Sequence, residues 1–458
     1  MSDGTKSAAR PKVEALLDAN SFVELGAGIT ARSTDFNVGA KDTPSDGVVC
    51  GHGLIDGNLV FVYAQDKEVL GGSIGEMHAR KICSVYDMAE KMGAPVIGIL
   101  DSTGVRLTES FDALDALGSI YARAAKASGV VPQITAITGN CGGGLATLAG
   151  LSDFVFMADD AKLFYQTPDS IPGNSAAKND TASAAYHFEV AGDVDGIGSE
   201  NDIFTAIRNL VTMLPGSLLE DGRKEDSKDD LNRASIGLSA ANGDARVIAA
   251  EIADSNNIFE VGAGSAKDML TAFIRLGGLT VGVVGNSDGS NTITGDGAAK
   301  AVAFVKFCDS FEIPVLSLVN VTGYERSEEG EKYMPRSVAR LVMAFAEASV
   351  GKITLVTGKA YGSAMLTMNS KAIGADMVFA LAESDMGIMD AKAASAIASD
   401  ISQADFASRI NGTANAVRRG TVDRVLAGED VRKYLIDGFD MLYTKREETA
   451  SYKKHSAK

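Results

Sequence analysis

The 458-residue sequence predicts an α/β fold built from two copies of one unit. Three observations support this prediction. Similar motifs recur at a fixed spacing, short segments rich in Val, Ile and Leu alternate with amphipathic segments, and a glycine-rich turn follows the same apolar segment in each half. Buried, largely parallel strands that alternate with helices give this pattern. The 49 glycines against nine prolines agree with many tight turns between strands and helices.

The internal repeat is the strongest of the three observations. The segment PVIGILDSTG begins at Pro95 and the segment PVLSLVNVTG begins at Pro314, so the two starts are 219 residues apart. The next motif ends at Gly139 in the first half and at Gly358 in the second, which is again a spacing of 219. A constant spacing over two motifs and the stretch between them indicates a duplication.

A mixed-charge segment separates the two copies. Residues 219–233 contain LEDGRKEDSKDDLNR, which has no apolar period. Segments of this kind are usually solvated linkers. We therefore expect an N-terminal domain over residues 1–234 and a C-terminal domain over residues 235–458.

The composition excludes several classes of function. A net charge of −17 disfavours nucleic acid and anionic membranes as partners. There is no signal-peptide pattern at the start and no apolar run of about 18 residues, so we expect a cytoplasmic protein that reaches a membrane only through a partner. Four cysteines and four histidines are too scattered for a metal cluster or a disulfide framework, and no metal is expected in this chain.

The glycine-rich turns are the candidate catalytic features. Each ends a strand and opens an apolar helix, as GNCGGGL over residues 139–145 and as GKAYGSA over residues 358–364. Consecutive N–H groups at a helix N-terminus stabilise an oxyanion that develops on a carbonyl oxygen. One such turn is equally well explained by tight packing, but two at equivalent positions favour a pair of oxyanion holes. Such a pair suits two substrates that each pass through an enolate.

Further motifs resemble those of the acyl-CoA carboxylase carboxyltransferase (β) family, which belongs to the crotonase superfamily. This family also includes the carboxyltransferase subunits of methylmalonyl-CoA and glutaconyl-CoA decarboxylases. In chain order the motifs are VLGGSIGE from Val69, DSTGVR from Asp101, SGVVPQI from Ser128, the two glycine-rich turns, FVKFCD from Phe304 and KAYG from Lys359. The resemblance extends from Val13 to Glu447. It implies tandem crotonase-like (ClpP/crotonase) domains, with an active site between the N-terminal domain of one subunit and the C-terminal domain of another.

The resemblance also implies roles for individual residues. Backbone N–H groups of Gly143 and Gly144 would bind the thioester oxygen of an acyl-CoA, and those of Ser363 and Ala364 would bind the ureido oxygen of biotin. The implied CoA-side positions are Gly71, Gly72, Ser73, Gly104 and Arg106, and the implied biotin-side positions are Tyr361 and Gly362. For Arg106, an ion pair is an equally weighted alternative. His187, close to Gly192, is the one weak histidine candidate.

The reaction that the resemblance implies moves a carboxyl group between carboxybiotin and the α-carbon of an acyl-CoA, of the propionyl/methylmalonyl or the acetyl/malonyl class. It needs no side-chain base. The chain has no biotin-attachment Met-Lys-Met tripeptide and no ATP-grasp domain. The expected partners are therefore a separate biotin carboxyl carrier protein and either a biotin carboxylase or a membrane decarboxylase subunit, together with further copies of this chain in a dimer-based hexamer.

The chain departs from the family pattern at several positions. Ser363 replaces a glycine, Leu145 replaces an alanine, and residues 320–324 (NVTGY) replace Asp-x-Pro-Gly-Phe. Two alternatives follow: a non-catalytic scaffold with the same fold, or a biotin-independent crotonase reaction such as hydration. Hydration typically needs acidic side chains in the site, and the two turns offer none.

Overall fold

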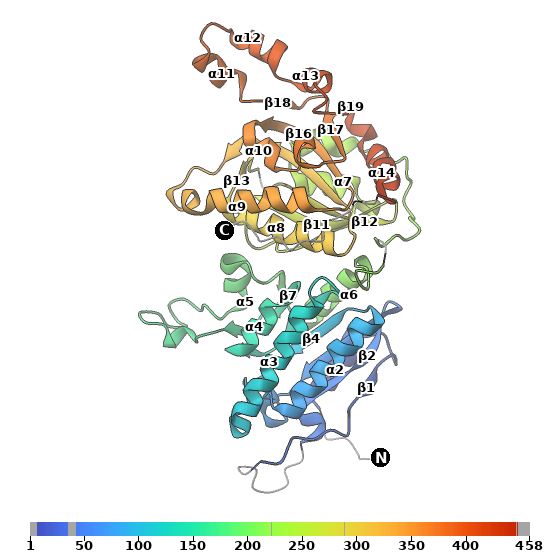
Figure 1. Cartoon of the computed structure of the whole chain (residues 1–458), viewed down its shortest axis with the longest axis vertical. Coiled ribbons are helices and arrows are strands. Elements are labelled where there is room, and N and C mark those ends of the chain that lie inside the picture. Colours follow the sequence, from blue (N-terminus) through green and yellow to red (C-terminus); the bar gives the residue numbers. More distant parts are fainter. Residues whose placement is uncertain (1–6, 35–42, 221, 288, 446, 448–458) are drawn as a thin grey trace. The chain divides into compact units, whose positions relative to one another are not determined.

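The computed structural model describes residues 7–34, 43–220, 222–287, 289–445 and 447. The chain divides into two compact units, Met1–Asp221 and Gly222–Lys458, which carry the labels of Figure 1. No helix within the described ranges is long and apolar enough to span a bilayer.

The second unit begins earlier in the chain than the predicted boundary at residue 235. The N–H of Glu225 donates to the carbonyl of Gly278 at 3.0 Å, and the N–H of Thr280 donates to the carbonyl of Arg223 at 2.9 Å. Part of the mixed-charge segment is therefore paired with the beginning of β12 (Leu279–Asn286) in the second sheet. The polar composition of this segment reflects its exposed side chains. Its backbone N–H and C=O groups nevertheless form hydrogen bonds with the sheet.

The first unit is built on a seven-stranded sheet in the order β1-β2-β3-β4-β5-β7-β9, with β6 and β8 paired separately. β1, β2 and β3 are antiparallel, and β3, β4, β5, β7 and β9 are parallel. The strands are β1 (Val23–Leu25), β2 (Val48–Ile55), β3 (Asn58–Gln65), β4 (Val96–Leu100), β5 (Gln133–Ile137), β6 (Asn140–Gly142), β7 (Phe154–Ala158), β8 (Lys162–Phe164) and β9 (Gly196–Gly198). The helices are α1 (Ala9–Leu16), α2 (Glu76–Met92), α3 (Ser110–Ala127), α4 (Gly144–Gly150), α5 (Ala184–Tyr186) and α6 (Glu200–Met213). The long helices α2 and α3 lie side by side (Figure 1).

The second unit repeats this plan, with the order β10-β11-β12-β14-β16-β17-β19 and β18 paired to β16. Its strands are β10 (Ile258–Glu260), β11 (Met269–Leu276), β12 (Leu279–Asn286), β13 (Thr292–Ile293), β14 (Val315–Val321), β15 (Gly323–Tyr324), β16 (Lys352–Tyr361), β17 (Met377–Leu381), β18 (Asp385–Gly387) and β19 (Arg424–Leu426). Its helices are α7 (Ala245–Ile252), α8 (Gly295–Ser310), α9 (Glu328–Glu347), α10 (Gly362–Thr367), α11 (Ala391–Ile397), α12 (Gln403–Asp405), α13 (Thr413–Arg418) and α14 (Val431–Leu442). Here α8 and α9 lie side by side, as α2 and α3 do in the first unit (Figure 1).

The strand registers confirm the duplication. Val96 pairs with Gln133 between β4 and β5, and Val315 pairs with Lys352 between β14 and β16. Both members of the second pair lie 219 residues after those of the first. A π-helical turn is repeated at the same spacing, over His187–Ala191 in the first unit and Phe406–Ile410 in the second.

Alternating side chains along the strands build a core on each face of the second sheet. Ala272 and Ile274 belong to an apolar cluster with α7 and α14. Phe273, between them, points to the other face, where its ring lies 4.9 Å from that of Phe304 and 6.1 Å from that of Phe307 on α8. Burying a side chain of this size contributes about 1.5–3 kcal/mol, so both layers of helices are fixed against the sheet that carries the site loops.

Candidate functional site

Three loops meet at the carboxyl ends of β3, β4 and β5 in the first unit. A Cβ added at Gly72 would lie 2.5 Å from the carbonyl oxygen of Asp101, so the loop after β3 touches the loop after β4. The N–H of Ser102 donates to the carbonyl of Asn140 at 2.9 Å, which joins the loop after β4 to the turn after β5. The carboxyl edge of a parallel sheet is the usual place for a ligand in an open α/β fold.

The first of these loops has an unusual backbone. Leu70, Gly71 and Gly72 all have positive φ, at 53°, 65° and 62°. A leucine in this region is strained, and such strain tends to occur at functional sites. Gly71 packs so closely that an added Cβ would lie 2.9 Å from Oγ1 of Thr103. The predicted CoA-side positions Gly71 and Gly72 are thus brought to the same sheet edge as the first glycine-rich turn.

The turn after β5 begins α4 through a conformation that only glycine adopts readily. Gly143 has φ 58° and ψ −123°, and a Cβ added there would meet nothing within 4 Å. Its N–H, however, donates to the carbonyl of Phe164 at 2.8 Å. This differs from the predicted role of Gly143 as an oxyanion donor, because pairing of β6 with β8 already uses that N–H.

The donors that the turn leaves available are those of Gly144 and Leu145. The first N–H groups of a helix have no intrahelical acceptor, and no acceptor is found for these two within the described part of the chain. The next N–H, of Ala146, returns to the carbonyl of Gly143 at 3.1 Å. Gly144 must itself be small, because a Cβ would lie 2.7 Å from Leu117 and 2.8 Å from the hydroxyl of Tyr121 on α3.

The second unit has the same turn at the start of α10. Gly362 has φ 60° and stands 219 residues after Gly143, with nearly the same φ. Ser363 and Ala364 then correspond to Gly144 and Leu145, so the first-turn N–H groups of the two copies match one for one. The side chain of Ser363 is exposed, and its backbone N–H is intact.

Tyr361, predicted on the biotin side, is mostly buried just before this turn. Its hydroxyl donates to Oδ2 of Asp385 at 2.5 Å, across the pairing of β16 with β18. Burial first, and then this hydrogen bond and the charge of Asp385, raise the pKa of Tyr361 above its usual range. The phenol is therefore neutral and holds the end of β16 in place.

Arg106 is buried among ion pairs and hydrogen bonds of the first unit. Its guanidinium lies 2.7 Å from Oδ1 of Asp46 and 2.8 Å from Oε1 of Glu109, and it donates to the carbonyl of Ser73 at 2.7 Å. Only 6% of the arginine is exposed. The predicted CoA contact at Arg106 is not supported by this geometry, because its charge is used inside the unit.

Ser73 and Gly104 lie on the same scaffold. The hydroxyl of Ser73 donates to the carbonyl of Leu70 at 2.7 Å and accepts from Nε of Arg106 at 3.2 Å. The N–H of Gly104 donates to Oγ of Ser102 at 3.0 Å, and its φ of 98° explains the glycine. Both residues shape the loops, and the space around Gly104 is open.

His187 has partners on both ring nitrogens. Nδ1 lies 2.9 Å from Oδ1 of Asp193, and Nε2 donates to the carbonyl of Leu163 at 2.7 Å. Burial lowers the pKa of His187, but the hydrogen bond and charge of Asp193 outweigh it, so the net shift is upward. Because both ring nitrogens have partners, the imidazole braces the π-helical turn and neither nitrogen is left free for catalysis.

Sequence reasoning missed the polar cavity at the carboxyl edge of the second sheet. Its volume is about 660 Å³, and its walls include Asn286, Asn320, Lys359 and Asp385. Asn286 is 1% exposed, and its Nδ2 has no hydrogen-bond partner among the described residues. The signal that was available is the 219-residue spacing, which makes Asn320 the equivalent of Asp101 in the second unit.

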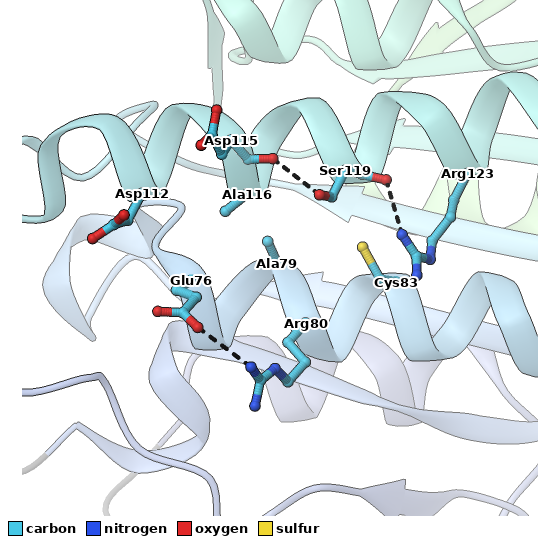
Figure 2. Close-up of a pocket in the computed structure, with 9 residues that line it drawn as sticks. All are labelled: Glu76, Ala79, Arg80, Cys83, Asp112, Asp115, Ala116, Ser119 and Arg123. Carbon is cyan, nitrogen blue, oxygen red and sulfur yellow. Dashed lines mark hydrogen bonds and ion pairs between the residues drawn. The ribbon is translucent and has the colours of Figure 1, made fainter.

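A second cleft lies between α2 and α3 in the first unit. Figure 2 shows small residues on its floor and charged residues on its rim, with Arg80 bonded to Glu76. Its volume is about 400 Å³, and none of the predicted site residues lines it. Cys83 in this cleft is mostly buried, and burial raises the pKa of its thiol, which makes it a poor nucleophile. In the described ranges, no three His, Cys, Asp or Glu side chains are grouped as metal ligands.

Comparison with known proteins agrees with this architecture. The carboxyl transferase domain model matches residues 2–457. The methylmalonyl-CoA decarboxylase subunit alpha of Propionigenium modestum is 34% identical, over 98% of this chain and 92% of its own length. A putative propionyl-CoA carboxylase beta chain of Bacillus subtilis is 37% identical, over 98% and 93%.

A solved structure is also similar over nearly the whole length. The transcarboxylase 12S hexamer with hydrolysed methylmalonyl-coenzyme A bound superposes with a TM-score of 0.93 at 32% identity, covering 98% of this chain and 92% of that one. The duplicated α/β fold predicted from the repeat, and the tandem crotonase-like domains that the family resemblance implied, are thereby confirmed. The chain belongs to the carboxyl transferase domain family and is a biotin-dependent acyl-CoA carboxyltransferase.

Proposed function

We propose that this chain is the carboxyltransferase subunit of an enzyme that exchanges a carboxyl group between biotin on a separate carrier protein and the α-carbon of propionyl-CoA or methylmalonyl-CoA. The observation that carries the proposal is the matched pair of helix-opening turns, one in each copy of the fold. In each turn a glycine with φ near 60° is followed by two N–H groups for which the described part of the chain offers no acceptor.

In the first unit, the N–H groups of Gly144 and Leu145 bind the thioester oxygen of the acyl-CoA. Charge develops on this oxygen when the α-carbon loses its proton or its carboxyl group, so donors that are already in place stabilise the transition state more than the ground state. The partial positive charge of the helix N-terminus adds to this effect. Gly143 sets the direction of the turn and leaves open space in which a ligand fits.

In the second unit, Ser363 and Ala364 act in the same way on the ureido oxygen of biotin. Biotin supplies the transferred carboxyl group and the base that handles the α-proton. This division of labour explains why neither turn needs a charged side chain. Tyr361, held neutral by burial and by Asp385, keeps the strand end before the turn rigid.

The substrate class is proposed from the relatives. Those at 34–37% identity are named for propionyl-CoA or methylmalonyl-CoA. We therefore propose the propionyl/methylmalonyl class of substrate in preference to the acetyl/malonyl class. A biotin carboxyl carrier protein is the expected partner, with a biotin carboxylase or a membrane decarboxylase subunit as the third component. The hexamer assembly of transcarboxylase 12S is the model for the oligomer that we expect.

The test is biotin-dependent decarboxylation by the purified chain. We expect release of CO2 from methylmalonyl-CoA when free biotin is added and none when biotin is omitted. Failure with both methylmalonyl-CoA and malonyl-CoA would support the scaffold alternative, and hydration of crotonyl-CoA without biotin would replace the proposal by crotonase chemistry. Co-purification with a biotin carboxylase or with a polytopic membrane subunit then decides the direction in the cell.

A further inference from the structure

We propose that Asp101 and Asn320 are equivalent positioning residues, each of which holds the donor turn of its own unit through a side-chain hydrogen bond. The carboxylate of Asp101 and the amide of Asn320 each suit the partners present in their own unit. The inference deepens the proposed function and rests on it for its kinetic readout. Neither side chain is assigned contact with a substrate.

The two residues make the same hydrogen bond at the same place in the repeat. Oδ1 of Asp101 accepts the N–H of Asn140 at 3.2 Å, and Oδ1 of Asn320 accepts the N–H of Lys359 at 3.0 Å. Asn140 and Lys359 each stand three residues before the glycine that opens the donor turn. Acceptor and donor residues are both 219 apart between the copies.

Close packing holds each side-chain oxygen against its turn, and we call this hydrogen-bonded contact the clamp. A Cβ at Gly139 would overlap the carboxylate of Asp101, and a Cβ at Gly358 would lie 2.6 Å from Oδ1 of Asn320. Both glycines therefore let the side-chain oxygen come directly beneath the turn. Removing the oxygen leaves one backbone N–H without this partner and opens space for the turn to move.

In the first copy, the second carboxylate oxygen faces a lysine. Oδ2 of Asp101 lies 3.5 Å from Nζ of Lys67, whose side chain is 58% exposed. The Asp101 side chain is 9% exposed, but its lysine partner is open to solvent and the contact is long, so we expect the pair to contribute no more than a surface ion pair, about 0–1 kcal/mol. An asparagine at position 101 would keep the Oδ1 acceptor and lose only this weak pair.

In the second copy, the other end of the side chain faces a carbonyl. Nδ2 of Asn320 donates to the carbonyl oxygen of Gly243 at 3.4 Å, and the backbone N–H of Asn320 donates to Oδ1 of Asn286 at 3.3 Å. An aspartate at position 320 would direct a negative oxygen at the Gly243 carbonyl oxygen, so that two acceptors would face and repel each other. We therefore expect Asp101→Asn to be tolerated in the first copy and Asn320→Asp to be harmful in the second.

Loss of the clamp should change turnover more than binding. The donors of each turn act most strongly on the charge of the transition state, so a displaced turn lowers kcat while KM, which reflects the whole ligand, changes little. Deleting one oxyanion donor costs about 100- to 1000-fold in kcat. A displaced turn that keeps its donors should cost less, about 10- to 100-fold on the same scale.

The experiment compares Asp101→Asn, Asp101→Ala, Asn320→Asp and Asn320→Ala in the full-length oligomeric protein. The control pair is Asp159→Asn and Asp159→Ala, because Asp159 is an exposed aspartate that directly follows the neighbouring strand β7. The measurements are kcat and KM for biotin-dependent decarboxylation of methylmalonyl-CoA, with thermal unfolding of each variant. Amide hydrogen exchange of Asn140 and Lys359 reports the clamp itself.

We expect Asp101→Asn and both controls to stay near the wild-type kcat, and the other three variants to lose kcat with KM nearly unchanged. Faster exchange at Asn140 in Asp101→Ala, and at Lys359 in Asn320→Ala, should accompany the loss. Wild-type kcat in both alanine variants, or equal loss in Asp101→Asn and Asp101→Ala, would overturn the inference. If an alanine variant does not fold, the isosteric pair Asp101→Asn and Asn320→Asp still decides. If the unaltered protein shows no decarboxylation, the proposed function fails, and amide exchange alone then tests the clamp.

Discussion

Replacing Gly143 by alanine tests whether the turn geometry carries the activity. Gly143 has φ 58° and ψ −123°, a region that is almost closed to residues with a Cβ. The added methyl group would meet no heavy atom within 4 Å, so the substitution introduces conformational strain without a steric clash. Any effect therefore comes from the backbone.

The magnitude follows from the two ways in which the chain can respond. If alanine keeps the native backbone, a strained residue costs about 1–3 kcal/mol of the free energy of unfolding. If the backbone relaxes instead, the 2.8 Å bond from Gly143 N–H to the Phe164 carbonyl is lost, which costs about 0.5–1.5 kcal/mol. Relaxation also moves the adjacent donors of Gly144 and Leu145, so kcat should fall by about tenfold or more.

The assay combines urea unfolding with biotin-dependent decarboxylation of methylmalonyl-CoA. Gly28→Ala is the matched control, because Gly28 is exposed, has no positive φ and leaves open space for a Cβ. We expect Gly28→Ala to behave as the wild type and Gly143→Ala to lose stability, kcat or both. Unchanged stability together with unchanged kcat in Gly143→Ala would refute the argument that this turn positions the donors.

Two further predictions concern the charged groups around the first site. Arg106→Met leaves the buried carboxylates of Asp46 and Glu109 without their cation, so the free energy of unfolding should fall by about 3–5 kcal/mol. KM for the acyl-CoA, measured on the folded fraction, should stay unchanged. A raised KM without loss of stability would instead support a CoA-binding role for Arg106. Because the pKa of His187 is raised above its usual 6.5, its pairing with Asp193 stabilises the fold fully below pH 6.5 and is lost as pH rises through the folded pKa. In urea unfolding at a series of pH values, the difference between wild type and His187→Gln should therefore be largest below pH 6.5 and shrink above it, and a difference that grows with pH would contradict the assignment.

The fold was predictable because it depends on patterns that a sequence displays directly. Strands such as Val96–Leu100 are short apolar runs between turns, and the fixed spacing of Pro95 and Pro314 identifies the repeat without any knowledge of the fold. The boundary was less predictable. Charged side chains around Lys224 indicate a solvated linker, yet the backbone there pairs with Leu279 at the start of β12. Composition reports which environment the side chains prefer, whereas pairing with a strand depends on backbone hydrogen bonds.

The sequence predicted which loops form the candidate site better than it predicted which atoms are free to bind a ligand. The glycine-rich turn identifies the loop around Gly143, but the use of its N–H by Phe164 depends on a pairing of β6 with β8 that no local pattern announces. Arg106 has the same difficulty. An arginine after a strand is compatible with CoA binding or with an ion pair, and only the burial of Asp46 and Glu109 beside it separates the two.

The duplication also bears on the scaffold alternative, which was motivated by Ser363. If catalysis depended on side chains, the differences between Gly144 and Ser363 and between Leu145 and Ala364 would give the two turns different capabilities. Backbone donors are present in every residue except proline, so these substitutions preserve the donor pair as long as the preceding glycine keeps its φ. Gly143 and Gly362 do keep it, at 58° and 60°. Beneath the turns, Oδ1 of Asp101 and Oδ1 of Asn320 accept equivalent backbone N–H groups, so the amide at position 320 gives no ground for a loss of function in the second copy.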